Sequence, residues 1–441
     1  MDGGAGMTAL PAAFAERMSR QLGNELPAFL HALELPPVRG IRINPEKVFP
    51  GSETIKQEMR IPWTEDGYLL PADSAAGSTV FHEAGAFYLQ EPAAMIPAEA
   101  MDVRPGEKIL DLCAAPGGKA TQMALKLHGE GLIVCNDPVP KRALILNRNI
   151  ERIGIANSIV ISCMPERIPD TWENFFDGVL VDAPCSGEGM FRREPDTRNE
   201  WSPGKASGCA ERQREILKNA ARFVKPGGRL VYSTCTYNPE ENEENVAWFL
   251  RTFPEFSPEP FLLSGAEGFN GRFLCLPHRI KGEGQFTAKL RKSGSAAASF
   301  MQCALPVPSK EELQTYRKLF PDLRVPNRKF GNTLVYIEEC PELKGIRVLR
   351  TGLHLAECRG NVLIPDHAAA LCPRSGTAPV TELPTEKVPE YIAGLESEGR
   401  IKGWTLMQYK GLRLGWGKGN GSSVKNHYPK GLRKNRIATE L

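Results

Sequence analysis

Residues 108–119 read KILDLCAAPGGK, a short apolar run followed by a turn of small residues and a lysine. The apolar run predicts a buried strand at 108–112, and the residues after the turn predict a helix at 119–127. Further expected strands are 131–135, 158–162, 178–181 and 229–233, and further expected helices are 141–153 and 206–224. This alternation is typical of an α/β fold in which helices cover both faces of a mostly parallel sheet.

The turn between the first strand and its helix has the features of a ligand-binding loop. Small residues let the backbone approach a ligand, and the helix start offers free amide donors. The spacing matches neither the GxxxxGK[ST] nor the GxGxxG nucleotide-binding pattern. Asp137 ends the second strand roughly 20 residues after the loop, where an acid can bind ribose hydroxyls. The sequence therefore predicts a nucleoside-type cofactor without a phosphate clamp, with S-adenosylmethionine favoured and NAD as the alternative.

Two cysteines follow the last two parallel strands of the predicted sheet. Cys185 lies in DAPCSGEGMFR, which begins at Asp182, and Cys235 lies in YSTCTYNPEENE, which begins at Tyr232. Open α/β sheets bind ligands at the carboxyl ends of their strands, so both thiols should face the cofactor edge. Buried structural cysteines are the simpler alternative, but they would meet at that edge only by coincidence. The positions favour catalysis.

The motifs LDLCAAPGGK, DAPCSGEGMFR and YSTCTYNPEENE resemble the signatures of the Nop/Sun family of RNA 5-methylcytosine methyltransferases. The bacterial RsmF branch, which modifies small-subunit ribosomal RNA, is the most similar. Further matches are FHEAGAFYLQEPAAM, GEGQFTAKLRK and GWGKGNGSSVKNHYPKGLR, so the resemblance runs from before the first strand to near the C-terminus. It implies a Rossmann-like class I methyltransferase fold with a mostly parallel seven-stranded sheet, S-adenosylmethionine as cofactor and RNA as substrate.

The resemblance also implies roles for individual residues. Cys235 is the expected nucleophile, Cys185 is expected to assist release from the product, and Asp182 is expected to contact the ring-nitrogen edge of the cytosine. A thiolate is needed because carbon 5 is too weak a nucleophile until addition at carbon 6 breaks the ring conjugation. DNA cytosine methyltransferases use the cysteine of a Pro-Cys motif, here Cys185, so the order of roles stays open on chemical grounds. The expected cofactor-binding residues are Cys113, Ala114, Ala115, Pro116, Gly117, Gly118, Lys119, Asp137 and Asp182.

Two further points concern residues near the predicted site, at Met164 and directly after Cys235. Relatives often carry an acid at or near the position of Met164, so the group that binds the adenine edge is not identified, and a backbone group is one alternative. Four acids follow Cys235, and we expect them to complement the dipole of the next helix rather than act in catalysis. They are Glu240, Glu241, Glu243 and Glu244.

The flanking segments predict further domains. Residues 1–75 contain amphipathic stretches at 12–22 and 27–33 and an extended basic segment at 39–45, which predict a small α+β domain. We expect a catalytic domain at 76–293, a linker at 294–309 and a C-terminal RNA-binding α+β region at 310–441. That last region can divide into subdomains at 310–375 and 385–441.

Basic residues concentrate near the C-terminus, although the formal net charge is only +3. Nine Lys or Arg residues and no acid lie between Lys402 and Arg436, which indicates an anionic partner. The aromatic residues among them predict stacking on unpaired bases, with a basic surface over buried aromatics as the alternative. They are Trp404, Tyr409, Trp416 and Tyr428, and further candidates for RNA contact are Arg39, Arg42, Lys47, Arg192 and Arg193.

The composition excludes several classes of protein. A 441-residue chain that is 41% hydrophobic and 24% charged is typical of a globular protein with several domains. No apolar run reaches the roughly 20 residues that span a bilayer. The eleven cysteines form no Cys-x-x-Cys pair, so no metal is expected. The N-terminus does not resemble a signal peptide, and we expect a cytoplasmic protein without membrane contact that acts as a monomer.

The leading hypothesis is therefore a ribosomal RNA cytosine-5 methyltransferase. One alternative is a transfer RNA or DNA methyltransferase of the same chemistry, and another is an idle RNA-binding assembly factor. The intact loop and both cysteines argue against an idle protein. An N6-adenine enzyme is disfavoured because Asp182-Ala183-Pro184-Cys185 lacks the aromatic residue that would stack on adenine.

Overall fold

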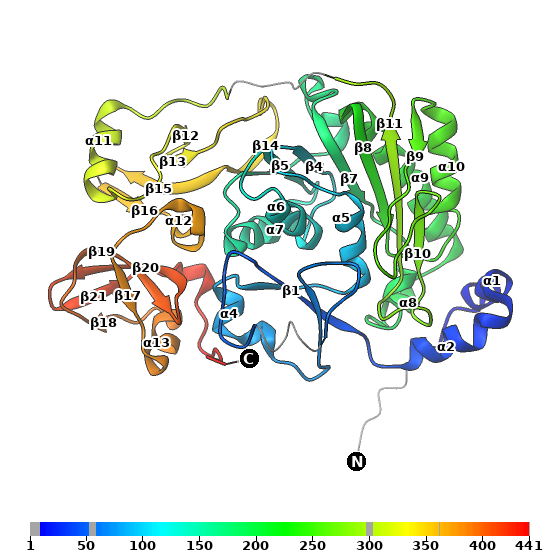
Figure 1. The fold of residues 1–441 in the computed structure, drawn as a ribbon, viewed down its shortest axis with the longest axis horizontal. Helices are drawn as coiled ribbons and strands as arrows, with labels where there is room; N and C mark the ends of the chain where they lie inside the picture. Colours follow the sequence, from blue (N-terminus) through cyan, green and yellow to red (C-terminus); the bar gives the residue numbers. More distant parts are fainter. Residues whose placement is uncertain (1–8, 53–58, 297–302, 361, 441) are drawn as a thin grey trace, which may run out of the picture.

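A computed structural model describes residues 9–52, 59–296, 303–360 and 362–440. A nine-stranded sheet forms its centre (Figure 1). Five parallel strands run in the order β8-β7-β4-β5-β6. They are β4 (Lys108–Asp111), β5 (Leu132–Asn136), β6 (Ser158–Ser162), β7 (Phe176–Asp182) and β8 (Val224–Thr234).

Antiparallel strands extend this parallel core. β11 (Gln285–Lys292) pairs with β8 and β10 (Arg272–Cys275) pairs with β11, which completes the expected seven-stranded sheet. β9 (Phe256–Pro258) also pairs with β11, and β14 (Arg347–Thr351) pairs with β6. The sheet is thus two strands larger than predicted, and β14 comes from the region that the sequence assigned to the C-terminal modules.

Residues of the parallel strands alternate between two hydrophobic cores. Ile109 and Leu180 pack on the face covered by α5, α6 and α7, and their neighbours Leu110 and Val181 pack on the face covered by α9 and α10. Successive side chains of a strand point to opposite faces of the sheet. A continuous apolar run therefore contributes buried side chains to the core on each face. The helices are α5 (Ile96–Ala100), α6 (Gly118–Lys126), α7 (Pro140–Ile153), α9 (Pro203–Phe223) and α10 (Glu243–Thr252).

The expected order of strands and helices is confirmed, with one difference at residues 225–228. The sequence predicted a strand that starts only at residue 229, but β8 begins at Val224, directly after α9. Gly227 has a positive φ of 77°, and the pairing with β7 shifts register between Phe176 and Gly178. A glycine thus permits an irregular start to the strand instead of a separate turn.

The predicted N-terminal helices are confirmed as α1 (Ala12–Leu22) and α2 (Leu26–Glu34), which lie beside α8 (Thr197–Glu200) in Figure 1. They pack against the segments that follow β7 and β8 rather than forming a core of their own. The ring of Phe14 lies 5.0 Å from that of Phe191, and the ring of Phe29 lies 5.2 Å from that of Tyr237.

The predicted extended segment is β1 (Arg39–Ile43), the middle strand of a small sheet. Its neighbours are β2 (Gly67–Leu70) and β3 (Phe87–Leu89), and α4 (Val80–Glu83) precedes β3. Since β3 pairs with β1, this sheet extends past residue 75, where the sequence placed a domain boundary.

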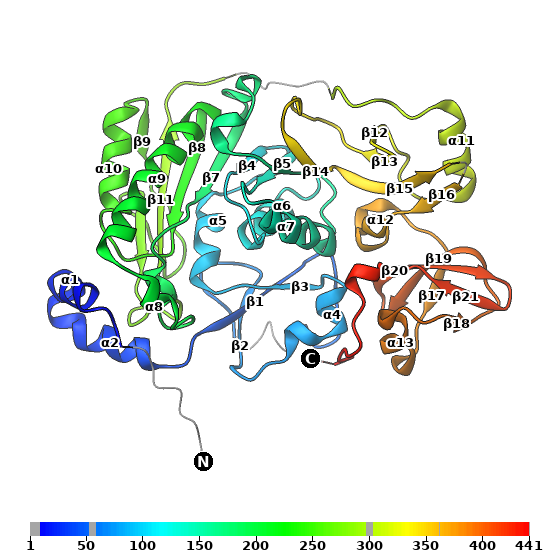
Figure 2. The same ribbon diagram turned by 180° about the vertical axis from the view of Figure 1, so that it is seen from behind.

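The C-terminal region forms two more sheets, seen from behind in Figure 2. One contains β12 (Arg328–Phe330), β13 (Thr333–Tyr336), β15 (Leu353–Arg359) and β16 (Val362–Pro365). The other contains β17 (Val380–Glu382), β18 (Ser397–Glu398), β19 (Lys402–Tyr409), β20 (Leu412–Asn420) and β21 (Ser423–Asn426). The helices are α11 (Lys310–Leu319), α12 (His367–Leu371) and α13 (Val388–Ala393). The expected linker lies partly outside the described residues.

The N-terminal sheet packs against the last C-terminal sheet in a shared core. Phe81 and Tyr409 stack with ring centroids 6.2 Å apart. A backbone bridge also joins Thr79 to Ala438. Within the described residues no helix is long and apolar enough to cross a bilayer.

Candidate active site

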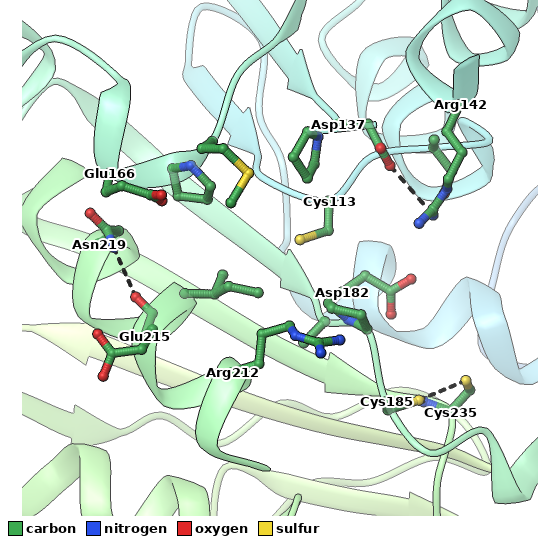
Figure 3. A pocket seen from close by; sticks show the side chains of 17 residues that line it. Cys113, Asp137, Arg142, Glu166, Asp182, Cys185, Arg212, Glu215, Asn219 and Cys235 are labelled. Atoms are coloured by element: carbon green, nitrogen blue, oxygen red, sulfur yellow. Dashed lines mark hydrogen bonds and ion pairs between the residues drawn. The ribbon is translucent and has the colours of Figure 1, made fainter. Parts of the chain in front are cut away.

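A cavity of about 600 Å³ lies at the carboxyl ends of the parallel strands (Figure 3). This volume falls within the range of roughly 300–1,000 Å³ that small-molecule sites occupy. Six of the predicted site residues line it, and they come from the ends of β4, β5, β7 and β8. They are Cys113, Ala115, Asp137, Asp182, Cys185 and Cys235.

The two predicted cysteines meet at this cavity. Their sulfur atoms lie 2.9 Å apart, and the backbone N–H of Cys235 donates to the Cys185 sulfur at 3.2 Å. The hydrogen bond with Cys235, together with burial, raises the pKa of Cys185 well above its ordinary value. Either sulfur can be the donor in the contact between them.

Asp182 lies beside the thiols and is held on both carboxylate oxygens. Lys119 contacts one oxygen at 2.7 Å, and the Ser233 hydroxyl donates to the other at 2.7 Å. Gln285 donates to the second oxygen from 3.4 Å. Burial acts to lower the pKa of Lys119, but the Asp182 carboxylate outweighs burial and raises it. The site thus pairs a fixed carboxylate with a permanent cation.

Asp137 supplies a second fixed carboxylate at the end of β5. Its Oδ1 accepts from the Val139 N–H at 2.9 Å, and Arg142 lies 3.4 Å from its Oδ2. Burial raises the pKa of Asp137. Among the described residues its Oδ2 has no hydrogen-bond partner, although it is buried at the cavity. This oxygen forms an ion pair with Arg142 but accepts no hydrogen bond, so it can accept one from a ribose hydroxyl.

The other predicted loop residues do not line the cavity. Ala114 is buried and Pro116 is exposed. A Cβ on Gly117 would lie 3.2 Å from Leu146, and one on Gly118 would lie 3.3 Å from Gln90. These glycines let α6 pack closely against protein neighbours, and their contact with a cofactor stays a prediction.

Helix α9 contributes a wall of the cavity that the sequence did not predict. Arg212, Glu215, Ile216 and Asn219 lie on one face of it at helical spacing. Three of these four residues are charged or polar, and such a helix face is as typical of a solvent-exposed surface as of a cavity wall. Glu166, two residues after Met164, also lines the cavity, and Figure 3 draws it near Asn219. Glu166 is thus an acid close to the position where the family resemblance implied one.

The prediction for the acids after Cys235 was right for Glu243 and Glu244 and wrong for Glu240 and Glu241, which precede the helix. Glu243 and Glu244 lie in the first turn of α10. Glu241 precedes the helix and is completely buried, and its carboxylate accepts hydrogen bonds from Ser186 in the Cys185 loop. The chain turns inward before α10, which helix periodicity does not reveal.

Several residues predicted to touch RNA are structural instead. Arg42 donates to the Gly118 carbonyl and Lys47 to the Arg152 carbonyl, so they fasten the N-terminal sheet to α6 and α7. Arg192 is buried and pairs with Glu283 at 2.8 Å. Arg39 donates to two carbonyls of its own domain, and Arg193 remains exposed.

The stacking prediction for the C-terminal aromatics was also wrong. The exposed fractions of Trp404, Tyr409, Trp416 and Tyr428 are 8%, 2%, 1% and 3%, because they form the core beneath the sheet. Eight of the nine basic residues are exposed. They are Lys402, Lys410, Lys418, Lys425, Lys430, Arg433, Lys434 and Arg436.

All eleven cysteines are free thiols. In the part of the chain that the structure describes, no three His, Cys, Asp or Glu residues gather as a metal site.

Family models match four successive parts of the chain. Their descriptions are the N-terminal domain of 16S rRNA methyltransferase RsmF (residues 10–92), 16S rRNA methyltransferase RsmB/F (98–291), the RsmF rRNA methyltransferase first C-terminal domain (316–372) and the methyltransferase RsmF PUA domain (378–434). The order of these matches follows the order of the sheets described above.

Relatives match over nearly the whole length. Ribosomal RNA small subunit methyltransferase F of Escherichia fergusonii is 32% identical and covers 96% of each chain, and that of Aliivibrio fischeri is 31% identical and covers 96% of this chain and 97% of its own. A solved methyltransferase homologue from Pyrococcus horikoshii is 30% identical over 64% of this chain and 94% of its own, with a TM-score of 0.55. NSun6 from the same organism, 23% identical over 65% of this chain and 99% of its own, shares the fold with a TM-score of 0.56.

These matches support S-adenosylmethionine as the cofactor of this chain. The Asp137 oxygen that accepts no hydrogen bond and the size of the cavity fit this cofactor. Sequence, fold and site agree that the chain belongs to the RsmF family of 16S rRNA methyltransferases.

Proposed function

We propose that this protein methylates carbon 5 of a cytosine in small-subunit (16S) ribosomal RNA through a covalent cysteine adduct. The observation that carries the proposal is the contact of two thiols beside Asp182 at the cofactor cavity. The names of the relatives support ribosomal RNA as the substrate. When bound, S-adenosylmethionine supplies an electrophilic methyl group.

Cys235 is the nucleophile in this proposal. Its thiolate adds to carbon 6 of the cytosine, and the electron pair of the carbon 5–carbon 6 double bond makes carbon 5 reactive. Burial and the hydrogen bond with Cys235 raise the pKa of Cys185, which disfavours the Cys185 thiolate as the attacking group. Family resemblance supports the same assignment.

Asp182 and Lys119 stabilise the ring during addition. Negative charge develops at the ring-nitrogen edge, so in this proposal Asp182 acts as a carboxylic acid that donates a proton to that nitrogen, while Lys119 and Ser233 hold its carboxyl group in place. Lys119 and Asp182 are already in contact, so neither side chain has to move as negative charge develops on the cytosine ring. The target base must leave any helical stack to reach this cavity, which favours single-stranded or loosened RNA.

Cys185 acts after methyl transfer. The proton on carbon 5 leaves to a base, its electron pair re-forms the double bond, and the bond between carbon 6 and sulfur breaks to return the Cys235 thiolate. The sulfur of Cys185 touches that of Cys235 and is therefore close to both bonds that break.

The C-terminal region is proposed to hold the RNA through phosphates rather than by base stacking. Lys418 on β20 and Lys425 on β21 are direct neighbours across the strands, and both are exposed. Like charges in this position are destabilising unless an anion binds between them. Neither forms an ion pair with any described acid.

Substitution of the two cysteines tests their roles. Cys235→Ser should lower methyl transfer at least about a thousandfold, because it removes the nucleophile. Cys185→Ala should leave the protein covalently attached to RNA, which is seen as a slowly migrating band after denaturing electrophoresis. Trapping by Cys235→Ser instead would reverse the assignment.

Bisulfite mapping tests the substrate. Ribosomal and transfer RNA from a strain that lacks this protein should differ from wild type by the loss of 5-methylcytosine in 16S RNA, and plasmid-borne wild type should restore it. Loss confined to transfer RNA would refute ribosomal RNA as the substrate, and an unchanged pattern in all RNA would refute cytosine-5 methylation.

Removal of the lysine pair tests the RNA surface. The double variant Lys418→Ala/Lys425→Ala should bind RNA more weakly at low salt and reduce the slope of log affinity against log salt by about two. Lys387→Ala is the matched control, since that exposed lysine lies in the same region but pairs with Glu390. Equal slopes for both variants would show that RNA does not contact these lysines.

A further inference from the structure

The residues on both sides of Cys185 are held by one pair of buried side chains. Gln213 on α9 donates to the carbonyl of Pro184 at 3.0 Å. Glu241 accepts from the backbone N–H of Ser186 at 2.9 Å and from its hydroxyl at 2.5 Å. Gln213 also donates to Glu241 at 2.9 Å, so the two act as one unit. We call it the Gln213–Glu241 clamp.

The clamp is itself fixed from the opposite side. The Tyr232 hydroxyl lies 3.0 Å from the Gln213 side-chain oxygen and 2.6 Å from the Glu241 carbonyl oxygen, and it can donate its single proton to either. Asn245 donates to the Gln213 oxygen at 2.9 Å. Gln213 and Glu241 are completely buried, so water does not compete for their hydrogen bonds. The two side chains are therefore held in a defined geometry.

The clamp acts on the position of Cys185 more than on that of Cys235. Cys235 follows β8 directly, and the sheet fixes it. Cys185 lies three residues past the end of β7, in a loop that returns to the sheet through the Gly189 N–H, which bonds to the Cys235 carbonyl at 2.9 Å. Between the end of β7 and Gly189, the clamp bonds to the carbonyl of Pro184 through Gln213 and to the N–H of Ser186 through Glu241.

We propose that Glu241 is a positioning residue for Cys185, and that through the Gln213–Glu241 clamp it governs release of the enzyme from methylated RNA rather than methyl transfer. This inference rests on the proposed function, in which Cys185 assists release. A displacement of about 1 Å can cost about a hundredfold in rate, so loss of the clamp should slow the step that Cys185 serves.

Two variants of Glu241 distinguish an effect of the position of Cys185 from an effect of the negative charge on Glu241. Glu241→Ala removes the clamp. Glu241→Gln can accept from the Ser186 N–H and Gln213 with its oxygen and donate to the Ser186 hydroxyl with its nitrogen, while that hydroxyl turns toward Thr236, 2.9 Å away. Glu240→Ala is the matched control, because Glu240 lies in the same loop but accepts from Ser207 on α9 instead. Gln213→Ala breaks the same clamp from its other half.

The test uses the full-length protein, S-adenosylmethionine, and small-subunit RNA from a strain that lacks the protein. Glu241→Ala should transfer methyl in a single turnover close to the wild-type rate, lose steady-state turnover about a hundredfold and accumulate covalent adduct as Cys185→Ala does. Glu241→Gln should restore turnover, and Glu240→Ala should behave as wild type. A merely structural role would lower both rates together and leave no adduct.

The outcomes distinguish this inference from the function on which it rests. If Cys185→Ala traps RNA but Glu241→Ala does not, the clamp has no role in release. If Glu241→Gln accumulates adduct as Glu241→Ala does, the charge and not the position matters, and the inference fails. If Glu241→Ala does not fold, Gln213→Ala decides by the same readouts. If Cys185→Ala itself leaves no adduct, the role of Cys185 fails first and the inference fails with it.

Discussion

Parallel pairing of β7 with β8 is the constraint on which the site depends. Asp182 pairs with Ser233, so the two segments that follow leave the sheet side by side. Cys185 and Cys235 then come three and two residues later and meet at a sulfur–sulfur distance of 2.9 Å. The hydrogen bond between the two sulfur atoms, together with burial, raises the pKa of Cys185 well above its ordinary value. The same pairing lets Ser233 hold Asp182 beside them.

The flanking segments support this arrangement directly. Arg17 on α1 pairs with the buried Glu188 at 2.6 Å, and Glu188 in turn accepts from the Tyr237 N–H just past Cys235. On the other side, Arg42 binds the carbonyl of Gly118 at the start of α6. The N-terminal region is therefore part of the catalytic scaffold, and most of its basic residues are used internally rather than on RNA.

Local signals were enough to predict the centre of the molecule. The apolar runs of the parallel strands and the residues that end them depend on short stretches of chain, so the strand order along the sequence, both cysteines, Asp137 and Asp182 were found at the predicted edge. The glycine loop was found at its predicted place as well, although Gly117 and Gly118 face protein neighbours.

Features that depend on distant partners could not be predicted. The addition of β14 to β6 joins residues nearly 200 positions apart, for which the sequence carries no local sign. The burial of Trp404 and Trp416 follows from sheet packing, since either face of a strand can be the inner one. Glu241 was misjudged because its partner Ser186 lies on another loop.

The most direct test of the covalent mechanism uses 16S RNA that contains 5-fluorocytidine. Fluorine cannot leave carbon 5 as a proton does, so the adduct persists after methyl transfer and can be digested and analysed by mass spectrometry. The account predicts a peptide that carries methylated 5-fluorocytidine on Cys235. A stable adduct on Cys185, or complete methylation with no adduct on either thiol, would contradict it.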